Sequence, residues 1–143
     1  MKQESYCAKQ LILLEGEQIL AVGEGVNRRL NPTNLSLKLP DVLSTKREGE
    51  KSYYRLREVK FKLQPMLVRK AVEQLRIGAE QLRAQNLDRL EIAVPLKNRK
   101  LKDNEKEFLG KALGGNRFQL KLDNAPVTLV VDGSVHFIGV ILL

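Results

Sequence analysis

The sequence contains few of the residues that build disulfides, zinc sites and nucleophilic relays. Among its 143 residues there is one cysteine, one histidine and no tryptophan. A single cysteine, Cys7, excludes an internal disulfide and any metal site made of several cysteines. We expect Cys7 to be a packing residue, because nothing near it in the sequence would lower the pKa of its thiol. The single histidine, His136, lies in an apolar run, and we interpret it as a strand position rather than a catalytic base.

Long apolar runs are also absent. No segment approaches the ~18 consecutive apolar residues of a membrane span, and the amino-terminal segment lacks the charged-then-apolar layout of a signal peptide. We therefore expect no membrane partner and a cytoplasmic location, although a toxin delivered by another module would look the same. With three Tyr and four Phe, the chain is also poor in the aromatic side chains on which single-strand binders stack bases.

Positive charge is abundant. Lys and Arg number 25 against 17 Asp and Glu, which gives a net charge of +8. Such a balance favours a nucleic acid or an anionic membrane surface as the partner. The chain has no internal repeat and no linker rich in Pro, Gly or Ser, so we predict a single domain that covers residues 1–143.

Hydrophobic periodicity predicts an α/β fold. Residues 35–39 and 53–63 alternate between apolar and polar, as half-buried strands do. Residues 11–14 and 19–22 are interpreted as a hairpin, with a helix before Gly16 as the alternative. Pro65 opens the clearest helix. The apolar positions of that helix recur at three- and four-residue steps, at Val68, Ala71, Leu75, Ala79 and Leu82.

The second half of the chain continues the mixture of strands and helices. Asn104 to Glu107 have the spacing of a capping box, which predicts a helix that ends near Gly114. Four further strands are expected at residues 90–94, 118–122, 127–131 and 135–142. The predicted fold class is therefore α/β, with a mixed central sheet and flanking helices.

Two carboxylates and a lysine are the candidates for chemistry. Asp41 follows the first alternating strand, and Glu58 and Lys60 lie on one face of the next. Carboxylate oxygens select hard cations such as Mg²⁺ or Mn²⁺, which can activate water against a phosphodiester. We expect Asp41 and Glu58 to hold the metal, with the carbonyl of Val59 as a third ligand. Lys60 would orient the attacking water or neutralise developing charge.

Pro40-Asp41 and Glu58-Val59-Lys60 resemble the motif of the PD-(D/E)XK nuclease superfamily, with a hairpin before the helix at Pro65 and a strand after it. The resemblance covers residues 35–94. It implies a restriction-endonuclease-like core and metal-dependent cleavage of nucleic acid, with DNA expected rather than RNA.

Two further features of the superfamily are carried over. Its members often have a glutamate on an earlier helix, and the resemblance leaves four acids open for that place: Glu4, Glu15, Glu17 and Glu24. Some members also have a Gln in the helix after the motif, which implies Gln74 as a catalytic residue. A solvated helix residue is the alternative for Gln74.

Each candidate site residue also has a purely structural interpretation. Asp41 could cap a turn, while Glu58 could pair with Arg57 or Lys60 on a wet sheet face, where ion pairs contribute little. A basic loop is expected to contact phosphates without reading sequence, and the alternative is a solvated surface loop. The residues of the loop assigned to nucleic acid are Lys97, Arg99, Lys100 and Lys102.

The sequence is compatible with three functions. The preferred one is a structure-selective, nonspecific or toxin-type endonuclease that depends on Mg²⁺, acts on DNA and could work as a homodimer. The second is a basic nucleic-acid-binding module without catalysis. The third is a protein-interaction subunit whose apolar carboxyl-terminal segment, residues 137–143, packs on another chain.

Overall fold

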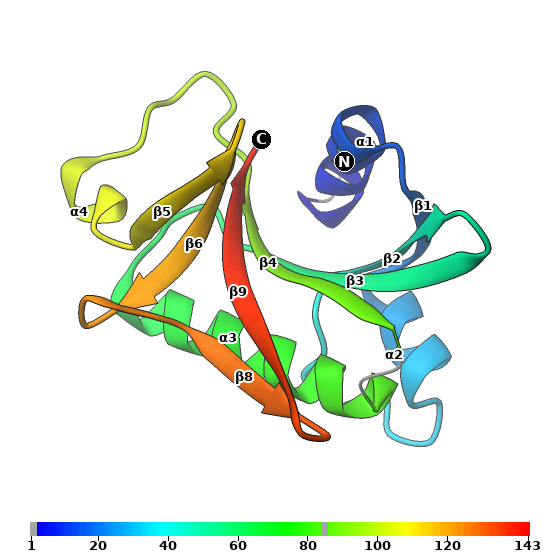
Figure 1. The fold of residues 1–143 in the computed structure, drawn as a ribbon. Helices are drawn as coiled ribbons and strands as arrows, with labels where there is room; N and C mark the ends of the chain where they lie inside the picture. Colours follow the sequence, from blue (N-terminus) through cyan, green and yellow to red (C-terminus); the bar gives the residue numbers. More distant parts are fainter. Residues whose placement is uncertain (1–2, 84–85) are drawn as a thin grey trace.

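The computed structural model describes residues 3–83 and 86–143 (Figure 1). One open, nine-stranded sheet runs through these residues in the order β1-β2-β3-β4-β9-β6-β5, with β7 paired to β6 and β8 paired to β9. Its strands are β1 (Gln18–Val22), β2 (Val42–Glu48), β3 (Lys51–Val59), β4 (Leu87–Val94), β5 (Leu109–Gly114), β6 (Arg117–Leu122), β7 (Ala125–Pro126), β8 (Thr128–Val131) and β9 (Ser134–Leu142). The helices are α1 (Gln3–Glu15), α2 (Glu24–Leu30), α3 (Pro65–Leu82) and α4 (Asp103–Lys106).

The sheet is mixed and mostly antiparallel. Only the β3–β4 and β4–β9 pairs are parallel, and the other neighbours are antiparallel. The parallel β3–β4 pair needs a crossover connection, which α3 supplies. The predicted class, α/β with a mixed central sheet and flanking helices, is therefore confirmed.

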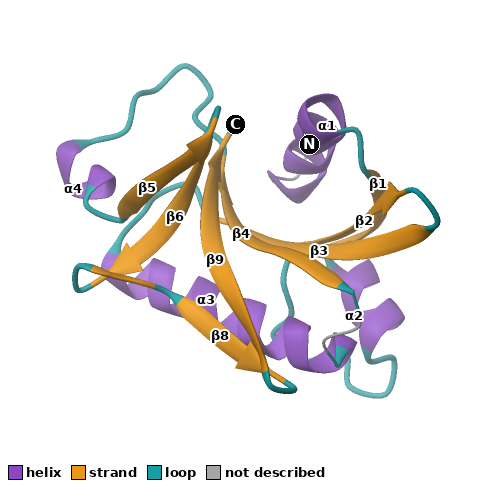
Figure 2. Ribbon diagram, in the orientation of Figure 1, coloured by secondary structure: helices purple, strands orange, loops and turns teal. Residues whose placement is uncertain are grey.

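Helix α3 covers one face of the sheet (Figure 2). Pro65 is its first residue, where the missing N–H costs nothing because a first-turn N–H has no helical partner. The predicted apolar stripe is confirmed, since all five of its members are buried: Val68, Ala71, Leu75, Ala79 and Leu82. They pack against sheet residues such as Leu43, Leu56 and Leu90.

Helix α1 covers the other face and corrects the hairpin predicted from residues 11–14 and 19–22. Residues 11–14 belong to α1, and residues 19–22 belong to β1. Cys7 and Leu11 are buried against a second apolar cluster that includes Val59 and Ile141. Gly16, with φ of 63°, ends the helix by donating its N–H to the carbonyl of Ile12. The sequence was ambiguous because a four-residue apolar run suits a helix as well as a strand.

Two other predicted elements differ. Residues 35–39 form no strand. Leu35 and Ser36 lie in a turn, and the side-chain amide of Asn27 donates to the Leu37 carbonyl at 2.7 Å. The helix predicted to run from Asn104 to Gly114 ends at Lys106, and Leu109–Gly114 form strand β5. Pairing with β6 decides this, because Leu109 lies opposite Leu120 in the sheet. Tertiary pairing has overridden local propensity. Within the described residues, no helix is both long enough and apolar enough to cross a membrane.

Gly78 lets the chain before β2 approach α3 closely. A Cβ atom at this position would lie 2.8 Å from Cδ of Pro40 and 2.9 Å from Cδ1 of Leu56, inside van der Waals contact. Pro40 therefore rests on the helix, and the residue that follows it, Asp41, is placed at the start of β2.

We expect Gly78→Ala to destabilise the protein by up to about 2 kcal/mol. Alanine gains about 1 kcal/mol of helix propensity, but overpacking at a tight contact costs about 1–3 kcal/mol. The matched control is Gly25→Ala in α2, where the new Cβ would meet Ala21 at an ordinary 3.6 Å. Urea denaturation of both variants checks this, and a Gly78→Ala protein as stable as wild type would contradict the packing argument.

Candidate active site

The register of the β2–β3 hairpin brings Asp41 and Glu58 together. Val42 lies opposite Arg57, and the pairing continues without a shift to Glu48 and Lys51. One further step in the same register sets Asp41 opposite Glu58. Directly opposed residues of an antiparallel pair have Cβ atoms about 4.5–5.5 Å apart, so two carboxyls at these positions must meet.

The contacts of the two acids are specific. Oδ2 of Asp41 accepts a hydrogen bond of 2.9 Å from the main-chain N–H of Val59. Oε2 of Glu58 lies 3.2 Å from Nζ of Lys60. The other oxygen of Glu58, Oε1, is buried and has no hydrogen-bond partner within the described residues. A buried carboxylate oxygen without a partner destabilises the folded state, and a bound ion or water molecule would satisfy it. We call Asp41, Glu58, Val59 and Lys60 the carboxylate site.

The pKa values of the two acids reflect this crowding. Burial, together with the adjacent Asp41 carboxyl, raises the pKa of Glu58 to about 8, although Lys60 acts in the opposite direction. Burial also raises the pKa of Asp41, against the lowering effects of Glu58 and of the Val59 N–H. Because its pKa lies above 7, the metal-free Glu58 carboxyl is protonated at neutral pH, which avoids two negative charges side by side in a buried position.

The donor set of the carboxylate site fits a Mg²⁺ ion. Within residues 3–83 and 86–143, no three Asp, Glu, His or Cys side chains are gathered closely enough to hold a metal by themselves. Mg²⁺ does not need such a cage, because it is usually held by one or two carboxylates while water and substrate phosphate oxygens complete the shell. The unpartnered Oε1 of Glu58 supplies one open ligand position. A cation would also remove the repulsion that keeps the pair protonated.

The structure separates the four acids that the sequence left open. Glu15 pairs with Arg89, Glu17 with Arg57, and Glu24 with Arg28. Only Glu4 of α1 acts on the carboxylate site, where its charge helps to raise the pKa of Asp41. Glu4 also lines a hollow of about 400 Å³ together with Gly23, whose N–H is bonded to the carbonyl of Asp41. This hollow lies beside the site.

Gln74 lies elsewhere. Its side-chain amide donates to the carbonyl of Leu39 at 3.4 Å, and it lines a separate surface hollow with Lys38 and Lys70. It therefore contacts the chain two residues before Asp41 rather than the carboxylates. The hydrogen bond of Gln74 helps to position the segment Pro40-Asp41. A direct role of Gln74 in a reaction stays a prediction.

The basic loop divides into anchored and free cations. Lys97 lies over the ring of Tyr6, 4.6 Å from its centroid. Arg99 pairs with Glu105 at 2.7 Å and also donates to the carbonyl of Phe61. Lys100 and Lys102 are exposed to solvent. The Arg99 bonds tie the loop to the residue that follows Lys60, so the loop is fixed close to the carboxylate site.

A buried charge network on the α1 face was missed by sequence reasoning. Arg57 is fully buried and donates to Glu17 at 2.6 Å and to Glu91 at 3.0 Å. Arg55, also buried, donates to Asp88 at 2.8 Å. The alternation of β3 contained the signal, because Arg55 and Arg57 share the face of Val59 and oppose Glu58. Arg57 therefore pairs away from Glu58, and of the two partners expected for Glu58 only Lys60 is present.

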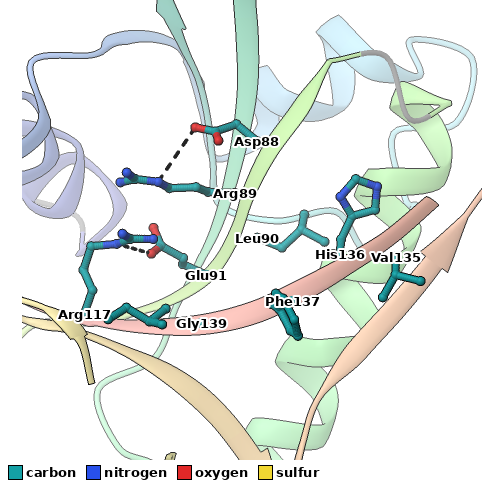
Figure 3. A pocket seen from close by; sticks show the side chains of 10 residues that line it. Asp88, Arg89, Leu90, Glu91, Arg117, Val135, His136, Phe137 and Gly139 are labelled. Atoms are coloured by element: carbon teal, nitrogen blue, oxygen red, sulfur yellow. Dashed lines mark hydrogen bonds and ion pairs between the residues drawn. The ribbon is translucent and has the colours of Figure 1, made fainter. Parts of the chain in front are cut away.

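A further hollow, of about 320 Å³, is lined mainly by residues of β4 and β9, together with Leu113 of β5 and Arg117 of β6 (Figure 3). Glu91 and Arg117 meet there at 2.8 Å, and Phe137 is exposed at its edge. His136 is the strand residue that the sequence predicted, opposite Leu129 of β8. Each acid drawn there already has an arginine partner, so the hollow offers no free ligand pair like the carboxylate site.

Cys7 cannot act as a nucleophile at neutral pH. It lies on α1 and is completely buried against the sheet, and burial raises the pKa of its thiol to about 12. The packing role predicted for it agrees with this environment.

Searches of protein-family models, of curated proteins and of solved structures found no match to this chain.

Proposed function

We propose that the protein is a Mg²⁺-dependent endonuclease of the PD-(D/E)XK type that hydrolyses phosphodiesters of nucleic acid, with DNA favoured over RNA. The observation that carries the proposal is the buried Asp41–Glu58 carboxyl pair, with one unpartnered oxygen and the ammonium of Lys60 beside it. Buried like charges destabilise a fold, and such an arrangement is typical of a functional site.

Each residue of the carboxylate site has a distinct part in this proposal. Asp41 and Glu58 would hold the ion, with the Val59 carbonyl as a further oxygen donor. A bound Mg²⁺ neutralises phosphate charge and lowers the pKa of water. The Val59 N–H orients Asp41 through the 2.9 Å bond. Lys60 stays close to Glu58 and can orient the attacking water or offset the charge that develops on the phosphate.

The surrounding elements support a restriction-endonuclease-like core. The hairpin β2–β3 carries the acids, α3 crosses over, and β4 returns parallel to β3. This is the strand-strand-helix-strand order that the resemblance implies. The carboxylate site lies where β2 begins and β3 ends, and Gly78 and Gln74 of α3 hold the segment that leads into it.

Cleavage assays test the proposal. Plasmid, branched DNA and tRNA are incubated with the protein in Mg²⁺, in Mn²⁺ or in chelator. We expect metal-dependent cleavage of DNA by the wild type and a loss of at least about 100-fold for Asp41→Asn, the scale seen when one charge-stabilising group is removed. The matched control, Asp103→Asn, changes a fully exposed acid and should cleave like wild type. Equal cleavage by Asp41→Asn and wild type, or no cleavage by either protein, would refute the proposed nuclease activity.

The non-catalytic binding module is the second candidate, favoured by the exposed lysines of the basic loop. It predicts salt-sensitive binding that is indifferent to metal and to substitution of Glu58. The protein-interaction candidate loses its main argument, because Ile138, Val140 and Ile141 of β9 are buried between β4 and β6. The carboxyl-terminal strand thus packs inside the sheet of its own chain. A homodimer stays a prediction, which light scattering can check.

A further inference from the structure

A small positively charged hollow lies just beyond the carboxylate site along the chain. Its volume is about 100 Å³, and it is lined by Lys62, Gln64, Arg99, Lys102, Asn104 and Glu105. A water molecule takes up roughly 30 Å³, so there is room for about three waters or one oxyanion group. Sites for whole small molecules are about 300–1,000 Å³, which makes this hollow too small for a nucleoside.

The charge of the hollow is positive after its internal pairing is counted. Arg99 is balanced by Glu105, with contacts of 2.7 and 3.1 Å between the two side chains. Lys62 and Lys102 are exposed, and within the described part of the chain neither pairs with an acid. Two lysines without an acidic partner therefore line a hollow that is the size of one oxyanion.

The walls of the hollow are fixed to the chain that leaves the carboxylate site. Arg99 donates to the carbonyl of Phe61, next to Lys60, and the N–H of Leu63 donates to Glu105 at 3.0 Å. The buried Glu105 also accepts a 3.1 Å bond from the N–H of Lys102. Lys62 and Lys102 are thus attached to one rigid frame, which cuts the entropy lost when they bind an anion together.

We propose that Lys62 and Lys102 bind a backbone phosphate of the nucleic-acid strand, on one side of the phosphate that is cleaved. The inference rests on the proposed function for the identity of the anion. Lys62 is four residues from Glu58, so their Cα atoms are at most about 14 Å apart. Phosphates of one strand follow each other at about 3.4 Å along a duplex axis. With the reach of the side chains added, the bound phosphate lies within several nucleotides of the scissile one.

Salt-dependent DNA binding in chelator tests the inference without any cleavage. Anisotropy of a labelled single strand and of its duplex is measured against NaCl for wild type, Lys62→Ala, Lys102→Ala, the double variant and Lys51→Ala. Lys51 is an exposed lysine at the opposite end of β3 from Val59, about 27 Å away at strand rise, and is the matched control. We expect the double variant to lower the slope of log K against log salt by about 1. Lys51→Ala should leave the slope unchanged.

Position is tested with neutral methylphosphonate linkages placed one at a time along the strand. For one linkage near the cleavage position, the neutral linkage should weaken binding by the wild type as much as the two lysine substitutions do. The same linkage should not weaken binding by the double variant any further. A double variant with the slope of wild type overturns the inference, and so does a wild type that does not bind DNA. If the lysine effect is present but Mg²⁺ gives no cleavage, the nuclease proposal falls together with the position relative to a cleaved phosphate, while the binding of a backbone phosphate by the two lysines stands.

Discussion

Replacing Glu58 by Gln should inactivate the protein and stabilise its metal-free form at the same time. Gln cannot carry the negative charge that would hold a cation, so cleavage should fall by at least about 100-fold. Gln has nearly the shape of the protonated Glu that the buried pair favours, so the electrostatic cost of the site disappears. Opposite effects on activity and stability are expected of a group kept for chemistry rather than for folding.

The pH dependence of this effect follows from the pKa of Glu58. The folded value is about 8, against an ordinary value of 4.5, so the folded state binds the extra proton between these limits. The contribution to stability is therefore fully present below about pH 4.5 and is lost as pH rises towards 8. The steepest loss is about 1.4 kcal/mol per pH unit. At pH 8 we expect Glu58→Gln to be more stable than metal-free wild type by on the order of 2–4 kcal/mol.

Urea denaturation in chelator at pH 5 and pH 8 measures this difference. Glu58→Gln should flatten the pH dependence, while Glu50→Gln, in the exposed turn before β3, should leave it unchanged. Added Mn²⁺ should stabilise wild type at pH 8, by about 2.7 kcal/mol at a hundred times its dissociation constant, and should have little effect on Glu58→Gln. A Glu58→Gln protein less stable than wild type at pH 8 would contradict the raised pKa.

Glu17→Ala is expected to be the most destabilising single substitution considered. Glu17 is 5% exposed and accepts bonds from Arg57 at 2.6 Å and from Ser44 at 2.6 Å. Its removal leaves the fully buried Arg57 with Glu91 as its remaining acidic partner. Breaking a buried pair costs about 3–5 kcal/mol when the other charge is left without compensation. We expect a loss at the lower end of this range, because Glu91 still compensates part of the Arg57 charge. That loss is a large share of the stability of a small domain.

The comparison that isolates burial is Glu24→Ala. Glu24 also pairs with an arginine, Arg28, but the two side chains are 85% and 65% exposed. An exposed pair of this kind contributes less than about 1 kcal/mol. Chemical unfolding of both variants, with near-ultraviolet spectra to confirm folding, gives the two values. Similar small losses for both would show that the network on β3 is dispensable.

How far the sequence predicted the fold depended on the length of the pattern. Helix α3 was predicted with its first residue and its apolar face because 18 residues repeat one period without interruption. Residues 11–14 were too few to tell helix from strand. Leu35, Leu37 and Leu39 alternate by chance in a turn segment, where Leu35 is 58% exposed. Strand β5 exists because β6 pairs with it, which no local signal reveals.

For the carboxylate site, the sequence supplied the residue types and the hairpin supplied their proximity. The two alternating segments implied that Asp41 and Glu58 could approach, but only the β2–β3 register sets them opposite each other. The identity of the nearby helical acid required tertiary structure, since Glu15 and Glu17 are taken up by arginines of the sheet. Gln74 shows the limit of carrying a role over by resemblance, because its side chain points to a carbonyl two residues from the site.

Strand β3 serves two separate tasks with its alternate residues: Glu58 on one side, and Arg55 and Arg57 on the other. Deleting or adding one residue within the strand would exchange the sides for everything beyond that point, unless a bulge absorbed the change. Such a change would turn Arg55 and Arg57 toward the apolar core that packs against α3. It would turn Glu58 toward α1. We therefore expect related proteins to keep the length of β3 even where its exposed residues near the turn, such as Lys51 and Ser52, are replaced.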